Sequence, residues 1–420
     1  MSYAKTANSS KQLIMCLKAK KLRVAIPKII NLKTLFMNKK IYSLIATLFT
    51  ILSSISCTHG ARDFDKGGNI IGVDLDTIQF QPSINDLFEK VEIIPLETNK
   101  ESIIESASRL KHQVYNDRHY ILAVKQNKLF VFDRKGNFVK TIEKIGNGPG
   151  EYRMIYDFEI SRFDGKLHLM TPYGRMLIYD SAGEKFIESF HLPDSIRAVH
   201  QFKILNEDIY VFNSDSENSD LYFYSKSKNE VVSSLSVMPN FLTATPFKYA
   251  RTPFYYYKDS LRYFMGYDGT VFNINPENFS LEKRYFLDFG KRNFILKDLP
   301  LNESVVYYYE YYKSIANKIA TGFAIYFETD KYLISRYDYM NNFNYLFYNK
   351  NSKRMVNAFK VKEDIQLSLS FIERDTLYDF IPVEFAHLFV NDKIVSAQNF
   401  DKLQKLTSDS NMFMIKYVLK

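Results

Sequence analysis

The stretch Ile145-Gly146-Asn147-Gly148-Pro149-Gly150-Glu151-Tyr152 separates two segments that are rich in expected β-strands. The first segment covers residues 120–145 and the second covers residues 155–192. Glycine adopts positive φ at little cost, so the three glycines of this stretch predict a turning connection between the segments. The remainder of the chain repeats the pattern of these segments, which indicates one repeating architecture.

A pair of apolar or aromatic residues followed by a polar residue recurs along the chain. The copies are Val131-Phe132-Asp133, Ile178-Tyr179-Asp180, Phe223-Tyr224-Ser225, Val271-Phe272-Asn273 and Phe347-Tyr348-Asn349. Their last residues are 47, 45, 48 and 76 positions apart. Each copy is followed by residues that favour a hairpin turn. A period in the mid-forties built from short strands is typical of β-propeller blades.

The length of the repeating region sets the number of blades. Divided by this period, and without the excess of the longest interval, residues 91–420 predict about six blades, with seven as the alternative. The excess lies within residues 290–327. There, residues at spacings of three and four predict a short helical insertion after a cap in residues 302–304. These residues are Val305, Tyr308, Tyr312, Ile315 and Ile319.

The opening stretch, with residues 131–138 before it, resembles the signature of the six-bladed β-propeller lipoproteins of Bacteroidota. That family is related in architecture to NHL-repeat and TolB-like propellers, and its ligands are mostly unknown. The resemblance covers most of residues 91–420 and implies an all-β propeller of about six four-stranded antiparallel blades. It also implies that residues 412–419 pair with residues 91–96 in one blade. The signature loop consists of Gly146, Gly148, Pro149, Gly150, Glu151 and Tyr152.

The positive charge of the chain is concentrated near its start. The formal net charge is +9, yet residues 1–57 contain ten basic and no acidic residues. Residues 58–420 therefore carry 46 basic and 47 acidic residues, a net charge of −1. This balance gives no electrostatic reason to expect nucleic-acid binding. Both cysteines, Cys16 and Cys57, lie in the N-terminal part, so no disulfide framework is expected in the body.

Residues 37–56 have the pattern of a secretory signal peptide, with two lysines, an apolar run over residues 41–55 and a small residue before Cys57. The ending Ser54-Ile55-Ser56-Cys57 resembles a bacterial lipobox with Ser54 in the place of the usual Leu, which implies lipidation of Cys57. Secretion without lipidation is one alternative. A transmembrane helix is another, but the apolar run is shorter than the ~20 residues that span a bilayer.

These patterns divide the chain into four parts. We expect an over-extended gene start at residues 1–36, a lipoprotein signal peptide at 37–56, a flexible tether at 57–85 and the propeller at 86–420. The protein would then be a lipoprotein of the outer membrane that faces the periplasm or the cell exterior. It would contact the membrane through its N-terminal lipid only.

The signature loop does not match a nucleotide-binding loop. No Lys-Ser or Lys-Thr pair follows it, and Glu151 stands where a dinucleotide loop needs a third glycine. A structural connection between two blades is the simpler interpretation. If the loop borders the central channel, Glu151, Tyr152 and Arg153 are the candidates for ligand contact.

No pattern in the body indicates catalysis. The histidines form no H-E-x-x-H motif, no G-x-S-x-G motif occurs, and His168 fits an alternating strand. We therefore assign no catalytic residue and no metal ligand, although calcium held in the central channel by several blades would leave no local motif. The tyrosines of residues 255–257 and 307–312 suit either packing between blades or an exposed recognition surface.

The sequence favours a lipid-anchored ligand-binding or protein-interaction module of the cell envelope, whose partner is a small ligand, a peptide, a glycan or an envelope protein. Two other functions stay open. A metal-dependent hydrolase or lyase would need acidic and amide side chains that converge in the central channel. A component of an outer-membrane complex would instead show an exposed apolar patch on the helical insertion.

Overall fold

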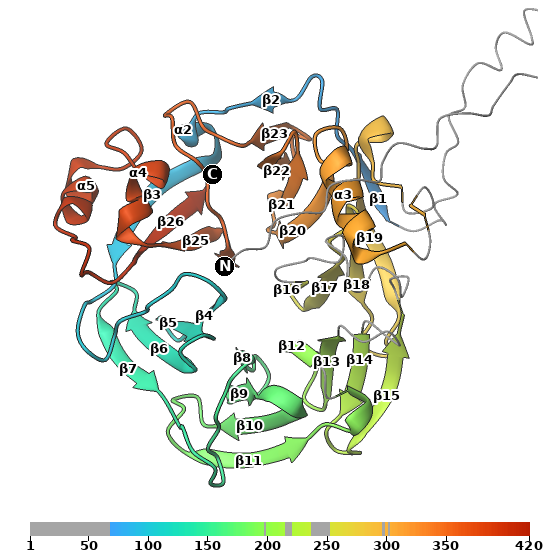
Figure 1. Cartoon of the computed structure of the whole chain (residues 1–420), viewed down its shortest axis with the longest axis vertical. Coiled ribbons are helices and arrows are strands. Elements are labelled where there is room, and N and C mark those ends of the chain that lie inside the picture. Colours follow the sequence, from blue (N-terminus) through green and yellow to red (C-terminus); the bar gives the residue numbers. More distant parts are fainter. Residues whose placement is uncertain (1–67, 197–198, 215–220, 237–252, 296–298, 301–302) are drawn as a thin grey trace, which may run out of the picture. The chain divides into compact units, whose positions relative to one another are not determined.

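Six β-sheets follow one another along the chain and are arranged in a ring (Figure 1). The computed structural model describes residues 68–420 except residues 197–198, 215–220, 237–252, 296–298 and 301–302. Each sheet contains four antiparallel strands, and two of the sheets carry a fifth, so the predicted all-β propeller is confirmed, with six blades rather than seven. The predicted gene start, signal peptide and Cys57 lie outside the described residues.

In each of the first three blades, four consecutive strands run from the centre of the ring outward (Figure 1). Blade 1 consists of β4 (Leu110–Tyr115), β5 (Arg118–Ala123), β6 (Lys128–Asp133) and β7 (Phe138–Ile142). Blade 2 consists of β8 (Asp157–Ile160), β9 (Leu167–Met170), β10 (Arg175–Tyr179) and β11 (Phe186–His191). Blade 3 consists of β12 (Val199–Ile204), β13 (Ile209–Ser214), β14 (Leu221–Ser225) and β15 (Glu230–Leu235).

Blades 4 and 5 have the same plan and carry one more strand each at the outer edge. Blade 4 consists of β16 (Phe254–Tyr257), β17 (Ser260–Phe264), β18 (Thr270–Ile274) and β19 (Leu281–Asp288), with β1 (Asn69–Gly72) parallel to β19. Blade 5 consists of β20 (Thr321–Glu328), β21 (Tyr332–Tyr339), β22 (Asn342–Asn349) and β23 (Met355–Ala358), with β2 (Gln79–Phe80) parallel to β23.

Blade 6 closes the ring because it combines both ends of the described chain. Its strands are β24 (Phe371–Glu373), β25 (Thr376–Ile381), β26 (Phe413–Leu419) and the N-terminal β3 (Phe88–Pro95). The last two strands pair antiparallel from Phe413 opposite Pro95 to Leu419 opposite Phe88, which confirms the predicted pairing. Closure in this way removes a free edge that the ring of sheets would otherwise expose.

Part of the predicted flexible tether forms regular secondary structure. Within residues 57–85, expected as a flexible tether, the structure places β1, β2 and the short helix α2 (Ile84–Leu87). The side chain of Ser83 accepts a hydrogen bond from the backbone N–H of Asn85 and caps α2. Residues 69–95 therefore form a strap that pairs in turn with blades 4, 5 and 6.

The five repeated sequence pairs all lie in or at the end of the third strand of a blade, namely β6, β10, β14, β18 and β22. The polar residues after each pair connect the third strand to the fourth, as predicted. Strands of this kind are apolar on both faces because each blade packs against two neighbours. In β6, Leu129 and Val131 contact the core shared with blade 2, whereas Phe130 and Phe132 contact the core shared with blade 6.

The predicted helical insertion is present as α3 (Val305–Ile315), between β19 and β20. The side chain of Ser304 accepts a hydrogen bond from the backbone N–H of Tyr307 and caps the helix. On the predicted apolar face, Tyr308 is buried and Ile315 is half-buried against blade 4. Val305, on the same face, is 46% exposed because the first turn of α3 extends beyond the core.

Further short elements lie in the connections. A second insertion, between β25 and β26, contains α4 (Ala386–Phe389) and α5 (Ala397–Gln404), and α5 lies beside β3. Single 3-10 turns occupy Pro172–Gly174, Asp194–Ile196, Gly290–Arg292 and Val383–Phe385.

The antiparallel order of each blade sorts its connections into two groups. The connections from second to third strand, and from each blade to the next, begin and end at one end of the blades, here called the connection end. The turns from first to second and from third to fourth strand lie at the other, the turn end. The signature loop and α3 are therefore both at the connection end.

A histidine pair lies at the seam between blades 1 and 6. The Nε2 atom of His112 is 2.9 Å from the Nδ1 atom of His119, and the two rings stack. The ring of His112 also contacts Tyr378 and Phe380 of blade 6. Burial lowers the pKa of both histidines, that of His119 to about 4, so the pair is neutral at pH 7.

Blades 4 and 5 are joined by a buried carboxylate. Glu328 of β20 accepts hydrogen bonds from the Nε atom of Arg262 at 3.0 Å and from the Nζ atom of Lys350 at 3.1 Å. The hydroxyl groups of Tyr255 and Tyr285 donate to the same carboxylate at 3.1 and 2.9 Å. Four donors thus compensate the cost of burying this charge.

Candidate functional site

The signature loop connects β7 to β8 and is held together by its own backbone. The N–H of Gly146 donates to the carbonyl of Tyr152 at 3.0 Å, and the N–H of Tyr152 donates to the carbonyl of Lys144 at 2.8 Å. The N–H of Gly148 donates to Oε2 of Glu151 at 2.8 Å. The carboxylate of Glu151 is therefore engaged inside the loop.

The loop packs on the outer strands of blade 2. Gly150 has φ +77°, and a Cβ atom there would lie 2.5 Å from Cγ of Phe186, so only glycine fits. The hydroxyl of Tyr179 donates to the carbonyl of Gly150, and Nη1 of Arg175 donates to the carbonyl of Glu151 at 3.0 Å. The packing against Phe186 therefore explains the glycine at position 150.

The three candidate ligand contacts differ in exposure. Tyr152 is 2% exposed, its hydroxyl accepts from the backbone N–H of Lys144, and burial raises its pKa. Arg153 is exposed and donates through Nε to Oδ1 of Asn147 at 2.9 Å, and Glu151 is half-buried. A role of Glu151, Tyr152 and Arg153 in ligand contact stays a prediction.

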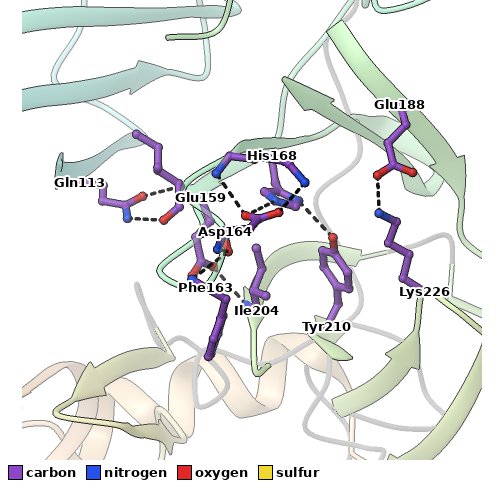
Figure 2. A network of polar contacts seen from close by, with 12 residues as sticks. Gln113, Glu159, Phe163, Asp164, His168, Glu188, Ile204, Tyr210 and Lys226 are labelled. Atoms are coloured by element: carbon purple, nitrogen blue, oxygen red, sulfur yellow. Dashed lines mark hydrogen bonds and ion pairs between the residues drawn. The ribbon is translucent and has the colours of Figure 1, made fainter. Parts of the chain in front are cut away.

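Polar side chains link the first strands of neighbouring blades to one another (Figure 2). The amide of Gln113 on β4 donates to the carbonyl of Ile160 on β8 and accepts from its N–H, both at 2.8 Å. The carboxylate of Glu159 on β8 accepts from the N–H of Ile204 on β12 at 3.2 Å. These side chains bond to backbone groups that no neighbouring strand pairs.

Charged groups join these contacts of Gln113 and Glu159, and together they are here called the inner polar cluster. The Nζ atom of Lys111 is 2.7 Å from Oδ1 of Asp157, and Nζ of Lys203 is 3.5 Å from Oε2 of Glu159. Burial raises the pKa of Glu159, which is 1% exposed, although Lys203 opposes the shift. Burial likewise lowers the pKa of Lys111, against the attraction of Asp157.

Blade 4 contributes to the same cluster across blade 3. The hydroxyl of Tyr256 on β16 donates to Oε1 of Glu159 at 3.1 Å. The guanidinium carbon of Arg162 lies 4.9 Å from the centroid of the Tyr256 ring, and Nη2 of Arg162 donates to Oδ1 of Asp259 at 3.1 Å. The turn after β8 is thereby fixed to the turn after β16 at the turn end.

The inner polar cluster bears on the enzyme alternative. Acidic and amide side chains do converge here, but from blades 1 and 2 only, whereas a hydrolase with a channel metal would draw them from several blades. In addition, Gln113, Asp157 and Glu159 already accept hydrogen bonds from backbone N–H groups of the adjacent blade. Within the described ranges of the chain, no three His, Cys, Asp or Glu residues are grouped so that they could hold a metal ion. Calcium in the channel stays a prediction.

The sequence gives no local signal for this cluster. The bonded partners are 47 residues apart for Gln113 and Ile160, and 45 apart for Glu159 and Ile204. These separations equal the blade period, so only an aligned comparison of the repeats could have paired them.

A second polar network lies in the core between blades 2 and 3 (Figure 2). The Nδ1 atom of His168 is 3.1 Å from the hydroxyl of Tyr210, and its Nε2 atom is 3.7 Å from Oδ1 of Asp164. Burial lowers the pKa of His168 to about 4. His168 and Tyr210 are 3% and 2% exposed, whereas Asp164 is exposed, so the imidazole of His168 is enclosed and His168 is the sheet residue that was predicted.

Large exposed apolar side chains are distributed unevenly between the two ends of the blades. At the connection end these are Ile145, Met154, Tyr173, Val305, Val306, Tyr307, Tyr309, Met340, Phe343, Phe385 and Leu388. At the turn end, the described part of the chain has one, Phe163. The tyrosines of α3 combine both interpretations offered by the sequence, because Tyr308 packs in the core while Tyr307 and Tyr309 face solvent.

Two solved structures from Bacteroides share the fold. The Bacteroides fragilis NCTC 9343 protein BF0058, which its description calls exported, has a TM-score of 0.64 and 16% identity, over 84% of this chain and 100% of that chain. A DUF4221 family member from Bacteroides vulgatus ATCC 8482 has a TM-score of 0.54 and 10% identity, over 80% of this chain and 97% of that chain. At these identities the similarity shows the fold alone.

No curated protein matches the chain in sequence. In the part of the chain that the structure describes, no helix is long and apolar enough to cross a membrane. A family model does match, and it covers residues 71–417, from the strap to the last strand of blade 6. The chain therefore belongs to the family described as "Domain of unknown function (DUF4934)".

Proposed function

We propose that this chain is a lipid-anchored propeller of the cell envelope that acts as a binding module through the connection end of its blades. The observation that carries the proposal is the gathering of exposed apolar side chains at that end. Water-exposed apolar surface is costly, and when it is concentrated on one side of a rigid scaffold it is typical of an interaction surface.

The compartment is inferred from two further observations. The predicted signal peptide at residues 37–56 ends at Cys57, and the similar protein BF0058 is described as exported. Replacing Cys57 with serine tests the anchor, because an unlipidated protein should move from the membrane fraction to the soluble fraction. Retention of Cys57→Ser in washed membranes would count against a lipid anchor.

The enzyme alternative has weaker support. A metal-dependent hydrolase or lyase needs side chains that are free to bind metal or substrate, whereas Gln113, Asp157 and Glu159 link neighbouring blades to one another. The inner polar cluster is accounted for by blade assembly, and the exposed apolar surface is not.

Site-specific photocrosslinking in cells tests the binding surface. A benzophenone amino acid would replace Val306 or Met340 at the connection end, and Phe163 at the turn end as the matched control. The proposal expects adducts from the first two positions and none from the third. Adducts from Phe163 alone, or from no position, would overturn it.

A further inference from the structure

An arginine and an aspartate on β21 lack the partners that buried charged groups usually have. Arg336 and Asp338 lie two residues apart and so share one face of the strand, yet they form no ion pair with each other. The Nε atom of Arg336 and the Oδ1 atom of Asp338 are buried and have no hydrogen-bond partner among the described residues. The same holds for Oγ1 of Thr321, which is opposite Asp338 on β20 and 0% exposed. Because such atoms are costly to leave unpaired, together they indicate a place where a further molecule binds.

A bulge in β20 makes room for the aspartate. Residues 322–324 of β20 lie opposite the single residue Tyr337 of β21. Gly322 has φ +63°, and a Cβ atom there would lie 2.5 Å from Oδ2 of Asp338. The same Oδ2 atom accepts a hydrogen bond from the hydroxyl of Tyr312 on α3. The carboxylate is therefore positioned through Oδ2, and Oδ1 is the atom left to bind something else.

An exposed aromatic ring lies beside these groups. Phe343 on β22 is opposite Asp338 and is 58% exposed. The guanidinium carbon of Arg336 lies 4.1 Å from the centroid of the Phe343 ring. This contact holds the guanidinium by its face, so the N–H groups in its plane stay available to donate hydrogen bonds.

The group lies at the connection end, where the core between blades 5 and 6 ends. Asp338 and Phe343 are close to the turn at residues 340–341, which joins β21 to β22. Farther from that turn on the same face, Ile325 and Tyr345 belong to the core that blade 5 shares with blade 6. The unpaired polar atoms are thus part of the surface that the proposed function assigns to binding.

The two charges limit the chemistry of the occupant. Asp338 repels an anion and Arg336 repels a cation, so the bound group is neutral and must both donate and accept hydrogen bonds. A peptide bond does not suit, because its N–H and C=O groups point in opposite directions. Hydroxyl groups on neighbouring carbon atoms do suit, since one donates to the carboxylate while the other accepts from the guanidinium. A water molecule would satisfy the buried atoms but would leave the Phe343 ring exposed, whereas a sugar also offers a C–H face.

We propose that Arg336, Asp338 and Phe343 form a binding site for a neutral sugar. Its hydroxyl groups bond to the guanidinium and the carboxylate, and its C–H face packs on the aromatic ring. This inference rests on the proposed function and names the class of ligand that the connection end takes.

Binding to printed glycans tests the site. The chain from Lys66 onward forms one compact unit with all six blades, and it is applied to an array that carries neutral and acidic glycans. The inference expects binding to at least one neutral glycan, whose Kd is then measured by calorimetry with the same glycan free in solution. An array on which no neutral glycan is bound would overturn the inference.

Two variants show whether binding occurs at this place. Phe343→Ala removes the exposed ring, and Phe163→Ala at the turn end is the matched control. Asp338→Asn keeps an oxygen that accepts from Tyr312 but replaces the other acceptor with a donor. Phe343→Ala and Asp338→Asn should each raise the Kd about tenfold or more, at an unchanged melting temperature for Phe343→Ala, and Phe163→Ala should leave the Kd as it is. A Kd that Phe343→Ala does not change would refute the assignment.

The same measurements distinguish this inference from the proposed function. Protein adducts from Val306 or Met340 in cells, without binding of any neutral glycan, would reject the sugar site and leave the proposed function standing. Glycan binding that depends on Phe343, in the absence of adducts, would support the sugar site and count against a protein partner.

Discussion

Acidification should destabilise the propeller at the seam between blades 1 and 6. His119 has an ordinary pKa of 6.5 when exposed, and burial lowers it to about 4 in the folded protein. Between these values the unfolded chain binds the proton more readily than the folded one. Stability therefore falls as the pH falls from 6.5 to 4, and no further loss from His119 follows below that.

The size of the effect follows from the same shift. For one histidine with these two pKa values, the free energy of unfolding drops by about 2 kcal/mol between pH 7 and pH 5. His168 has the same lowered pKa and should contribute a similar amount. Since His112 stacks on His119, protonation of either ring would also place a charge against aromatic groups of blade 6.

Urea unfolding between pH 7 and pH 4.5 measures this dependence. His119→Gln should flatten the slope in that range, whereas His191→Gln, at an exposed position, should leave the slope unchanged. The reasoning would be refuted by a stability that is constant from pH 7 to 4.5, or by a slope that His119→Gln does not alter.

Three further predictions concern single features. Gly150→Ala should lower the free energy of unfolding in urea by about 2 kcal/mol or more, because its Cβ would overlap Phe186. Gly72→Ala is the control and should cost far less, since a Cβ there meets nothing within 4 Å. Equal effects of the two substitutions would contradict the packing argument. Glu328→Gln should lower the free energy of unfolding by about 3 kcal/mol, because it leaves the charge of Arg262 uncompensated. Glu310→Gln, at an exposed ion pair, should cost under about 1 kcal/mol. A small effect of Glu328→Gln would show that the network is dispensable. A metal assay on the chain from Lys66, with melting before and after chelation, should show no stoichiometric metal and no shift; a bound metal whose removal lowers the melting temperature would favour the enzyme alternative.

The repeating features of the fold could be predicted from the sequence because they recur. A pair such as Val131-Phe132 before a polar turn marks the third strand of every blade up to the fifth, and its spacing predicts the blade number. The closing pair of β3 and β26 followed from the resemblance. The helical insertion followed from residues spaced by three and four, although the exposure of Val305 depends on where the core ends.

Other features depend on contacts that no local pattern records. The strands β1 and β2 have four and two residues, too few for an alternating pattern, and they form only because the edges of β19 and β23 are available. The inner polar cluster pairs residues one blade apart. The apolar connection end combines residues from several blades, so it is visible only once the topology is known.

The strap also has a mechanical consequence. If the N-terminus is anchored as proposed, tension on Gly68 would reach β1 first, then β2, and only then the eight-residue β3 that closes blade 6. β1 and β2 make few backbone hydrogen bonds to their partner strands, so they would detach before the pairing of β3 with β26 is broken. Their detachment would free residues 68–87, and the chain between the N-terminus and blade 6 would extend by up to about 70 Å with all six blades still in place.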